Sequence, residues 1–296
     1  MSGARTRVVP TTLPLHVTEH LDEGHVSQAS GRDHGQAAEP TFVLLHGYAG
    51  SSYTWRYWAP RLTSRGRVLT VDLKGFGDAP KPEDGRYAPG DLADLVVALL
   101  RELDLRNVTL IGHSLGGGVA LLTALRLHDS GEDRLARLVL IGSPAYRQKL
   151  PPLVPLSKVP GLTAPLLEMI GAKRAVRSVL RQIVFDPDGV TEEQVDAYAR
   201  PLATREGVLA AMAAGRSIVP DDLDAMAARY PDIDVPALVL WGDHDRVVPL
   251  RIGERLASDL PNARLVVMER CGHVPPEEHP EASFAHLEDY LDGTGG

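Results

Sequence analysis

Residues 108–116 have the sequence VTLIGHSLG, in which Ser114 stands between two glycines at the end of an apolar run. Residues 108–111 predict a buried strand, and residues 119–127 predict a helix directly after it. In a G-x-S-x-G turn between a strand and a helix, the serine hydroxyl is lifted clear of the backbone, and glycines flank it because side chains there would clash. The stretch therefore predicts a strand, a tight turn and a helix, with Ser114 as a candidate nucleophile.

On both sides of this turn, short apolar runs alternate with segments of helical periodicity. The predicted strands cover residues 41–45, 68–73, 135–141, 237–240 and 265–268. The predicted helices cover residues 53–62, 91–103, 252–260 and 280–291. Such alternation is typical of an α/β fold with a doubly wound, mostly parallel sheet. Sites in these sheets lie at the carboxyl ends of the strands, where this chain has the polar residues His46, Asp72 and Ser114.

The alternation stops between residues 146 and 232. Here apolar residues recur at helical spacing, at Val176, Val179, Leu180, Ile183 and Val184, and residues 191–194 form a capping box. We predict a helical insertion after the sixth strand. The domain prediction is a core of residues 1–145 and 233–296, with residues 146–232 as a cap or lid over the same site.

The start of the chain has weaker patterns. Residues 13–19 alternate between apolar and polar side chains and predict a first strand, whereas residues 20–40 are polar and predict a surface loop. The histidines of this region are His16, His20, His25 and His34. Their irregular spacing, without nearby cysteines, favours a solvated loop over a metal site.

Composition limits the class of protein. The 296 residues suit one α/β domain with an insertion, and 44% hydrophobic with 24% charged residues is typical of a soluble globular protein. The formal net charge of -8 argues against a nucleic-acid partner, because such binding depends on clustered Lys and Arg. Residues 1–15 lack the apolar core of a signal peptide, and residues 107–125 contain four glycines, so we expect no integral membrane segment. The single cysteine, Cys271, fits a reducing compartment, and we predict a cytoplasmic protein.

A serine nucleophile needs a histidine to take its proton and a carboxylate to orient that histidine. In this type of sheet the chain order is serine, then acid, then histidine. After Ser114, the sequence WGDHD closes the strand at residues 237–240, and Gly272-His273 follows the strand at residues 265–268. The order therefore holds, with Asp243 and Asp245 as alternative acids.

These motifs resemble those of the α/β-hydrolase family. The resemblance covers nearly all of residues 41–291 except the insertion. The matched segments are His46-Gly47, Asp72 with Gly75-Phe76-Gly77, the turn at Ser114, Gly242-x-x-Asp245-x-x-x-Pro249, and Gly272-His273 followed by Glu278 and Pro280. By position, the resemblance implies Ser114 as nucleophile, Asp245 as triad acid and His273 as general base. The family spacing favours Asp245 over Asp243, either of which could instead cap the helix that begins near Pro249.

The same resemblance implies an oxyanion hole and no cofactor. One donor in this fold is the backbone N–H after the nucleophile, here Leu115, and the resemblance points to the backbone N–H of Tyr48 as the second. The mechanism needs neither a metal nor an organic cofactor. His113 is expected to pack or hydrogen-bond locally, and simpler structural roles for Ser114 and His273 stay open at this point.

The leading functional hypothesis is hydrolysis of a carboxylic ester of a small or medium apolar substrate through an acyl-enzyme. The insertion, with Tyr198 and Phe185 among its few aromatic residues, suggests an apolar cap, although these side chains could instead pack only on the core. An epoxide hydrolase or haloalkane dehalogenase of this fold would have aspartate in place of Ser114.

Other chemistries remain as alternatives. A C–C bond hydrolase of dienoic or diketone substrates resembles this chain, but commonly has asparagine and tryptophan where His113 and Val274 stand. A lactonase or acyltransferase would use the same triad. A ligand-binding receptor built on a hydrolase scaffold is the alternative of another class. The sequence predicts a small-molecule ester or ketone as partner and makes no prediction of the oligomeric state.

Overall fold

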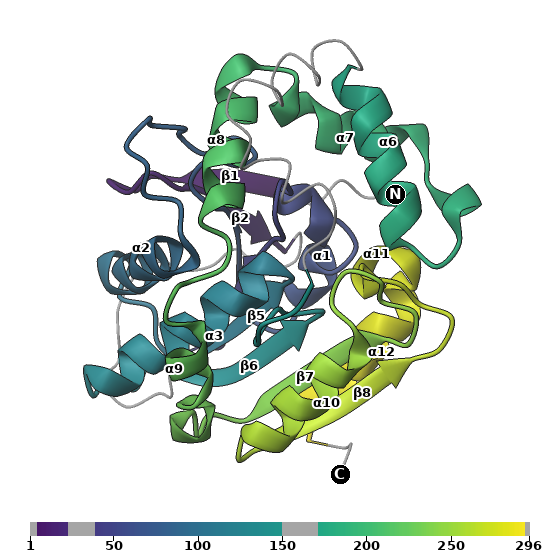
Figure 1. The fold of residues 1–296 in the computed structure, drawn as a ribbon. Helices are drawn as coiled ribbons and strands as arrows, with labels where there is room; N and C mark the ends of the chain where they lie inside the picture. Colours follow the sequence, from purple (N-terminus) through teal and green to yellow (C-terminus); the bar gives the residue numbers. More distant parts are fainter. Residues whose placement is uncertain (1–4, 23–38, 150–170, 294–296) are drawn as a thin grey trace.

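The computed structural model describes residues 5–22, 39–149 and 171–293, and eight strands of these residues form one sheet in the order β1-β2-β4-β3-β5-β6-β7-β8 (Figure 1). The strands are β1 (Arg5–Val9), β2 (His16–Leu21), β3 (Thr41–Leu45), β4 (Arg67–Asp72), β5 (Val108–His113), β6 (Leu135–Ile141), β7 (Ala237–Gly242) and β8 (Ala263–Met268). Strands β3 to β8 pair in parallel, whereas β2 is antiparallel to both β1 and β4. The predicted mostly parallel sheet is confirmed.

Side chains alternate between two cores on the two faces of the sheet, as the period-2 geometry of a strand requires. Val43 and Leu45 of β3 belong to one core, and Phe42 and Leu44 belong to the other. The first core contains residues of α2 (Pro89–Glu102), α3 (Leu115–Asp129) and α10 (Leu250–Asp259). The second contains residues of α1 (Ala59–Leu62) and α12 (Pro280–Leu291). Helices therefore cover both faces, and every central strand is buried.

Between β6 and β7 the described elements of secondary structure are all helices, as predicted. The elements are α6 (Ala172–Ile183), η2 (Pro187–Gly189), α7 (Glu192–Leu202), α8 (Arg205–Arg216), α9 (Leu223–Ala227) and η3 (Tyr230–Asp232). The predicted capping box begins α7, since Gln194 N donates to Thr191 Oγ1 at 3.2 Å and Thr191 N donates to Gln194 Oε1 at 2.9 Å. Figure 1 shows α6, α7 and α8 at one end of the molecule, away from α10 and α12.

Two parts of the structure differ from the sequence-based expectation. Strand β1 was not predicted because it is an edge strand whose first four residues are exposed, so it has no apolar alternation. The helix predicted over residues 53–62 is instead a short turn, η1 (Ser52–Trp55), followed by α1. Pro60 has no N–H to continue a helix and is tolerated only in a first turn, so the two pieces are separate.

The strand predicted over residues 13–19 is β2, which begins three residues later and runs to Leu21. His16 and His20 lie in this strand rather than in a loop, whereas His25, His34 and most of the predicted loop at residues 20–40 lie outside the described residues. Within the residues that are described, no helix has the length and apolar character needed to span a bilayer.

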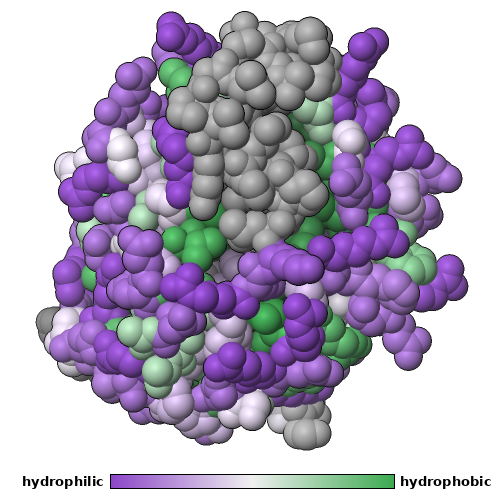
Figure 2. All heavy atoms as spheres, viewed as in Figure 1, coloured by the Kyte–Doolittle hydropathy of each residue, from purple (hydrophilic) through white to green (hydrophobic). Residues whose placement is uncertain are grey.

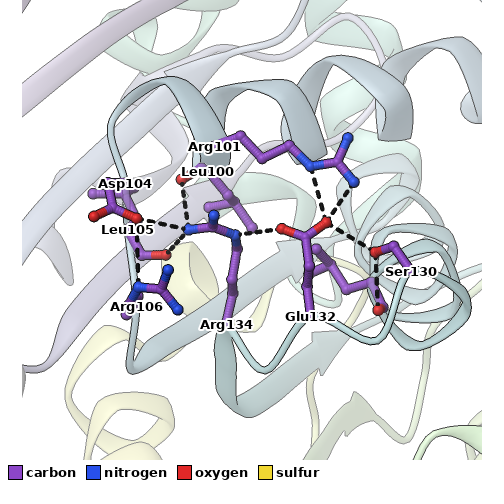
Figure 3. A network of polar contacts seen from close by, with 9 residues as sticks. Leu100, Arg101, Asp104, Leu105, Arg106, Ser130, Glu132 and Arg134 are labelled. Atoms are coloured by element: carbon purple, nitrogen blue, oxygen red, sulfur yellow. Dashed lines mark hydrogen bonds and ion pairs between the residues drawn. The ribbon is translucent and has the colours of Figure 1, made fainter.

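A network of ion pairs lies at the amino ends of β5 and β6 (Figure 3). This is the edge of the sheet opposite the carboxyl ends, where a site is expected. Glu132 accepts from Arg101 Nη2 at 2.5 Å and from Arg134 Nε at 2.7 Å. These two guanidinium groups hold the pKa of Glu132 down to about 2. Arg134 also pairs with Asp104 at 3.2 Å, so the network joins the end of α2 to the loop that precedes β6.

Candidate active site

Ser114 lies in the turn between β5 and α3, with φ 50° and ψ -121°. Such a backbone conformation costs a residue with a side chain about 1–3 kcal/mol. The strand and helix approach so closely that a Cβ on Gly112 would lie 2.3 Å from the Gly116 carbonyl oxygen. Ser114 N donates to Ile141 O at 2.8 Å, which fastens the turn to β6. The predicted strand, tight turn and helix around Ser114 are confirmed.

His273 and Asp245 meet beyond the carboxyl ends of β8 and β7. His273 Nδ1 donates to Asp245 Oδ2 at 2.7 Å, and both side chains are almost fully buried. The second carboxylate oxygen of Asp245 accepts from the N–H groups of Val247 and Val248, each at 2.8 Å. The carboxylate is therefore fixed in place, and its bond to Nδ1 leaves Nε2 of His273 as the nitrogen that can accept a proton.

The alternative acid, Asp243, has different partners. Its Oδ1 accepts from His244 Nδ1 at 2.6 Å and from Cys271 N at 3.2 Å. Asp243 therefore binds the backbone of the loop after β8 and not the His273 side chain. Of the two carboxylates that sequence reasoning left open, the structure brings only Asp245 to His273.

Ser114 and His273 line one cavity, although no hydrogen bond joins their side chains. Bonds of this kind are often long in an unliganded protein and tighten when substrate is bound. Gly142 lies behind His273 with φ 52°, and a Cβ at this position would lie 3.0 Å from His273 Nδ1. The glycine thus leaves the imidazole room to lie beside Asp245.

His113 lies beside the nucleophile and does bond locally, as expected. Its Nε2 donates to the carbonyl oxygen of His273 at 2.8 Å. Burial, with a smaller contribution from the neighbouring His273, lowers the pKa of His113 to about 3. His113 is therefore neutral, with its proton on Nε2, and its buried Nδ1 has no hydrogen-bond partner.

The loop after β3 is fixed by His46. His46 Nδ1 donates to Gly47 O at 2.7 Å, while its Nε2 accepts from Leu73 N at 3.0 Å. Burial lowers the pKa of His46, so this imidazole is neutral. Gly47 passes so near the nucleophile that a Cβ on it would lie 3.1 Å from Ser114 Cβ. Tyr48, the next residue, lines the same cavity, and its hydroxyl donates to Ala211 O in α8 at 2.6 Å.

Asp72, the remaining polar residue at a strand end, accepts hydrogen bonds from backbone and serine groups of these loops. Its Oδ1 accepts from the N–H and the hydroxyl of Ser52, both at 2.6 Å. Its Oδ2 accepts from Asp78 N at 2.8 Å. The carboxylate therefore ties η1 to the loop after β4 and takes no part in the cavity.

The cavity has a volume of about 630 Å³ and a mainly apolar lining. The insertion supplies much of this lining, including Val176, Leu180, Ile183, Tyr198, Met212 and Met226. Phe185, which the sequence suggested for the same role, instead packs against His244 with 4.8 Å between the rings. In the view of Figure 2, polar residues cover most of the surface and hydrophobic residues form smaller groups among them.

Arg147 is the one Asp, Glu, Lys or Arg side chain among the described residues that line the cavity. Its Nε donates to Asp224 Oδ2 at 2.7 Å and its Nη2 donates to Asp221 O at 3.0 Å. The guanidinium is half-exposed and already paired. The one charged side chain that the described residues place in the lining is therefore ion-paired.

Two neighbouring acids of α11 (Pro275–Glu278) contact the loops around the site, and sequence reasoning gave neither of them a role. Glu277 binds Arg56 at 2.7 Å, and Glu278 binds backbone N–H groups on both sides of His273. For Glu278, the sequence signal was its match to the family pattern after His273. No such signal existed for Glu277, because its partners come from distant parts of the chain.

Comparison with known proteins gives a consistent result. The model of the family described as alpha/beta hydrolase fold matches residues 40–280. A 2-hydroxymuconate semialdehyde hydrolase of Pseudomonas sp. is 31% identical over 86% of this chain and 87% of its own length. A pimeloyl-[acyl-carrier protein] methyl ester esterase of Neisseria meningitidis is 33% identical over 85% of this chain and 93% of its own. An α/β-hydrolase fold protein of known structure from Burkholderia ambifaria is 28% identical with a TM-score of 0.75, covering 93% of this chain and 94% of its own.

Proposed function

The chain belongs to the alpha/beta hydrolase fold family, and from this premise we propose that it is a serine hydrolase that cleaves a carboxylic ester through an acyl-enzyme. The observation that carries the proposal is the arrangement of Ser114 on its strained turn, in one cavity with the hydrogen-bonded pair His273 and Asp245. A small molecule is the proposed substrate, because the cavity has a volume of about 630 Å³ and a mainly apolar lining.

In this mechanism Ser114 Oγ attacks the ester carbonyl carbon while His273 Nε2 takes the hydroxyl proton. The tetrahedral intermediate collapses, the alcohol leaves with the proton from His273, and the acyl group stays on Ser114. Water then attacks the acyl carbon while His273 Nε2 takes a proton from it. The bond to Ser114 Oγ breaks, His273 returns the proton to that oxygen, and the carboxylic acid product leaves. Asp245 holds the imidazole in the required tautomer and stabilises its positive charge.

The N–H groups of Tyr48 and Leu115 are the proposed oxyanion hole. Neither donates a hydrogen bond to another described residue. Leu115 is the first residue of α3, whose N-terminal N–H groups lack partners within the helix. Two such donors would stabilise the developing negative charge, and each is worth about 3–4 kcal/mol in enzymes of this type.

The proposed substrate is an uncharged ester with an apolar acyl or alcohol group. Residues from α6 to α9 supply apolar side chains to the cavity, which supports residues 146–232 as a cap over a core of residues 1–145 and 233–296. Arg147 is engaged by Asp224, so the described lining favours a neutral substrate over an anionic one. The lone, buried Cys271 agrees with a cytoplasmic location.

Cleavage of a C–C bond is the second candidate, favoured by the similarity to 2-hydroxymuconate semialdehyde hydrolase at 31% identity. Two observations count against it. Such a substrate carries a carboxylate, and this chain has His113 and Val274 where C–C bond hydrolases commonly have asparagine and tryptophan. An acyl-enzyme that passes its acyl group to another alcohol, or opens a lactone, would use the same residues. A receptor that binds without turnover is the remaining alternative.

The test is hydrolysis of p-nitrophenyl esters graded from acetate to decanoate, beside Ser114→Ala and beside a 2-hydroxy-6-oxo-dienoate. We expect ester hydrolysis that depends on chain length, is lost in Ser114→Ala, and rises with pH as the base loses its proton. Turnover of the dienoate without the esters would establish the second candidate. Absence of turnover and of fluorophosphonate labelling at Ser114 would leave only the receptor.

A further inference from the structure

The Glu278 carboxylate accepts hydrogen bonds from three backbone N–H groups in two separate parts of the chain. Its Oε2 accepts from Gly272 N at 2.9 Å and from Phe185 N at 2.6 Å, and its Oε1 accepts from Val274 N at 3.0 Å. Gly272 and Val274 flank His273, whereas Phe185 follows α6 in the insertion. One carboxylate therefore binds the loop of the proposed base and the end of an insertion helix together.

A direct contact reinforces this connection. His273 N donates to the carbonyl oxygen of Ile183, the last residue of α6, at 2.8 Å. The two segments lie so close that a Cβ on Gly272 would lie 2.4 Å from the same carbonyl oxygen. Figure 1 shows the corresponding end of α6 beside α11. The backbone of His273 is thus held between the insertion and α11.

Ile183 has a second contact, since this residue also lines the cavity. An apolar group bound in the cavity and the backbone of His273 therefore contact the same residue from two sides. A ligand that packs on α6 would stabilise the position of the helix end to which His273 is bonded.

We infer that Glu278 is a positioning residue that couples the docked end of α6 to the orientation of His273, so that occupancy of the apolar cavity raises the rate of the chemical step. The inference rests on the proposed role of His273 as general base. A carboxylate is suited to this position because it offers acceptors only, and charge-assisted bonds to N–H groups are the stronger ones.

Glu278→Gln is the sharpest test, because it keeps the shape and replaces one acceptor oxygen by a donor NH₂ group. Whichever way the amide is oriented, at least one N–H next to His273 then loses its acceptor. We expect kcat for p-nitrophenyl hexanoate to fall about 100-fold, the effect of a small misplacement of a reacting group. KM should stay within about threefold, and the rise of kcat with acyl length should be lost.

Glu277→Gln is the matched control. Glu277 and Glu278 are both partly buried, and the Glu277 carboxylate binds Arg56 Nη1 at 2.7 Å, Gln194 Nε2 at 3.2 Å and the Tyr198 hydroxyl. It fastens α7 to the core and bonds to no residue of the loop that contains His273. This variant should lower the thermal midpoint at least as much as Glu278→Gln but keep kcat within about threefold, since it leaves that loop unchanged.

A second readout is the downfield NMR resonance of the proton between His273 Nδ1 and Asp245, which reports the geometry of that bond without turnover. We expect it to shift or broaden in Glu278→Gln and not in Glu277→Gln. Equal kcat in Glu278→Gln and wild type, or equal losses in both variants, would overturn the inference. If wild type neither hydrolyses esters nor reacts with fluorophosphonate, the proposed function fails, and an unchanged resonance in Glu278→Gln would separately overturn the positioning role.

Discussion

The ring of His113 lies against the ring of His273, with 4.9 Å between their centroids and an angle of 50° between their planes. Through Nε2, His113 also donates to the His273 carbonyl oxygen. The neighbour of the proposed nucleophile thus supports the loop of the proposed base. Because His113 is neutral, it places no second cation beside His273 that would oppose protonation of the proposed base during turnover.

The low pKa of His113, about 3, predicts a pH-dependent stability. Below about pH 6.5 an unfolded histidine binds a proton that folded His113 does not. The unfolding free energy therefore falls by about 1.4 kcal/mol for each unit by which the pH is lowered, until folded His113 also binds a proton. His113→Asn should remove this slope between pH 6 and pH 4, as measured by urea unfolding. The variant also loses ring packing at pH 7, so the slope is the diagnostic quantity. Parallel curves for variant and wild type would contradict the prediction.

The positive φ of Ser114 predicts that the turn stores strain. Ser114→Gly and Ser114→Ala should both abolish ester hydrolysis, since each lacks the hydroxyl. Glycine adopts this conformation freely, so Ser114→Gly should be about 1 kcal/mol more stable than Ser114→Ala in urea unfolding. Equal stabilities would mean that the turn is relaxed with an ordinary side chain.

The bond from His273 to Asp245 predicts which acid supports catalysis. Asp245→Asn should lower kcat for ester hydrolysis about 10⁴-fold, because the amide favours the wrong imidazole tautomer. Asp243→Asn is the matched control, because it alters a neighbouring carboxylate that does not touch His273, and its kcat should change less than about tenfold. The reverse ranking would transfer the acid role to Asp243.

The position of Met212 in the cavity lining predicts control of substrate length. Met212→Trp should fill part of the cavity and lower kcat/KM for the longest p-nitrophenyl esters at least about tenfold relative to the acetate. Met212→Leu nearly conserves volume and should keep the wild-type profile. A profile that Met212→Trp leaves unchanged would place the acyl chain elsewhere.

The sequence predicted elements that have a local apolar pattern, and it missed features that depend on contacts between distant residues or on a break within such a pattern. The strand β6 (Leu135–Ile141) and the helix α12 (Pro280–Leu291) have the predicted bounds, because apolar residues within each, such as Phe284 and Leu287 of α12, are buried in the fold. Strand β1 escaped prediction because its stability comes from pairing with β2 at an exposed edge. The break before Pro60 was missed since the apolar residues on either side of it continue with helical spacing.

The candidate site shows the same division. Ser114 and the choice between two acids followed from motifs, whereas the contact of Asp245 with His273 depends on how two loops meet. Glu278 contacts Phe185, which is 93 residues earlier in the chain, so no local pattern could predict that bond. The affinity of the cavity for one acyl group depends on several insertion helices at once, and a motif contains no information about their packing.

The bonds from Glu278 and Ile183 to the loop around His273 restrict how this protein can be re-engineered. Exchange of residues between β6 and β7 for those of a homologue would alter the lining of the cavity, because α6 to α9 contribute to it. An exchange that replaced residues 183–185 would change the segment to which the loop around His273 is bonded. The first crossover point should therefore lie beyond Phe185. Ile183 and Phe185 then stay in the same protein as their native partners, His273 and Glu278.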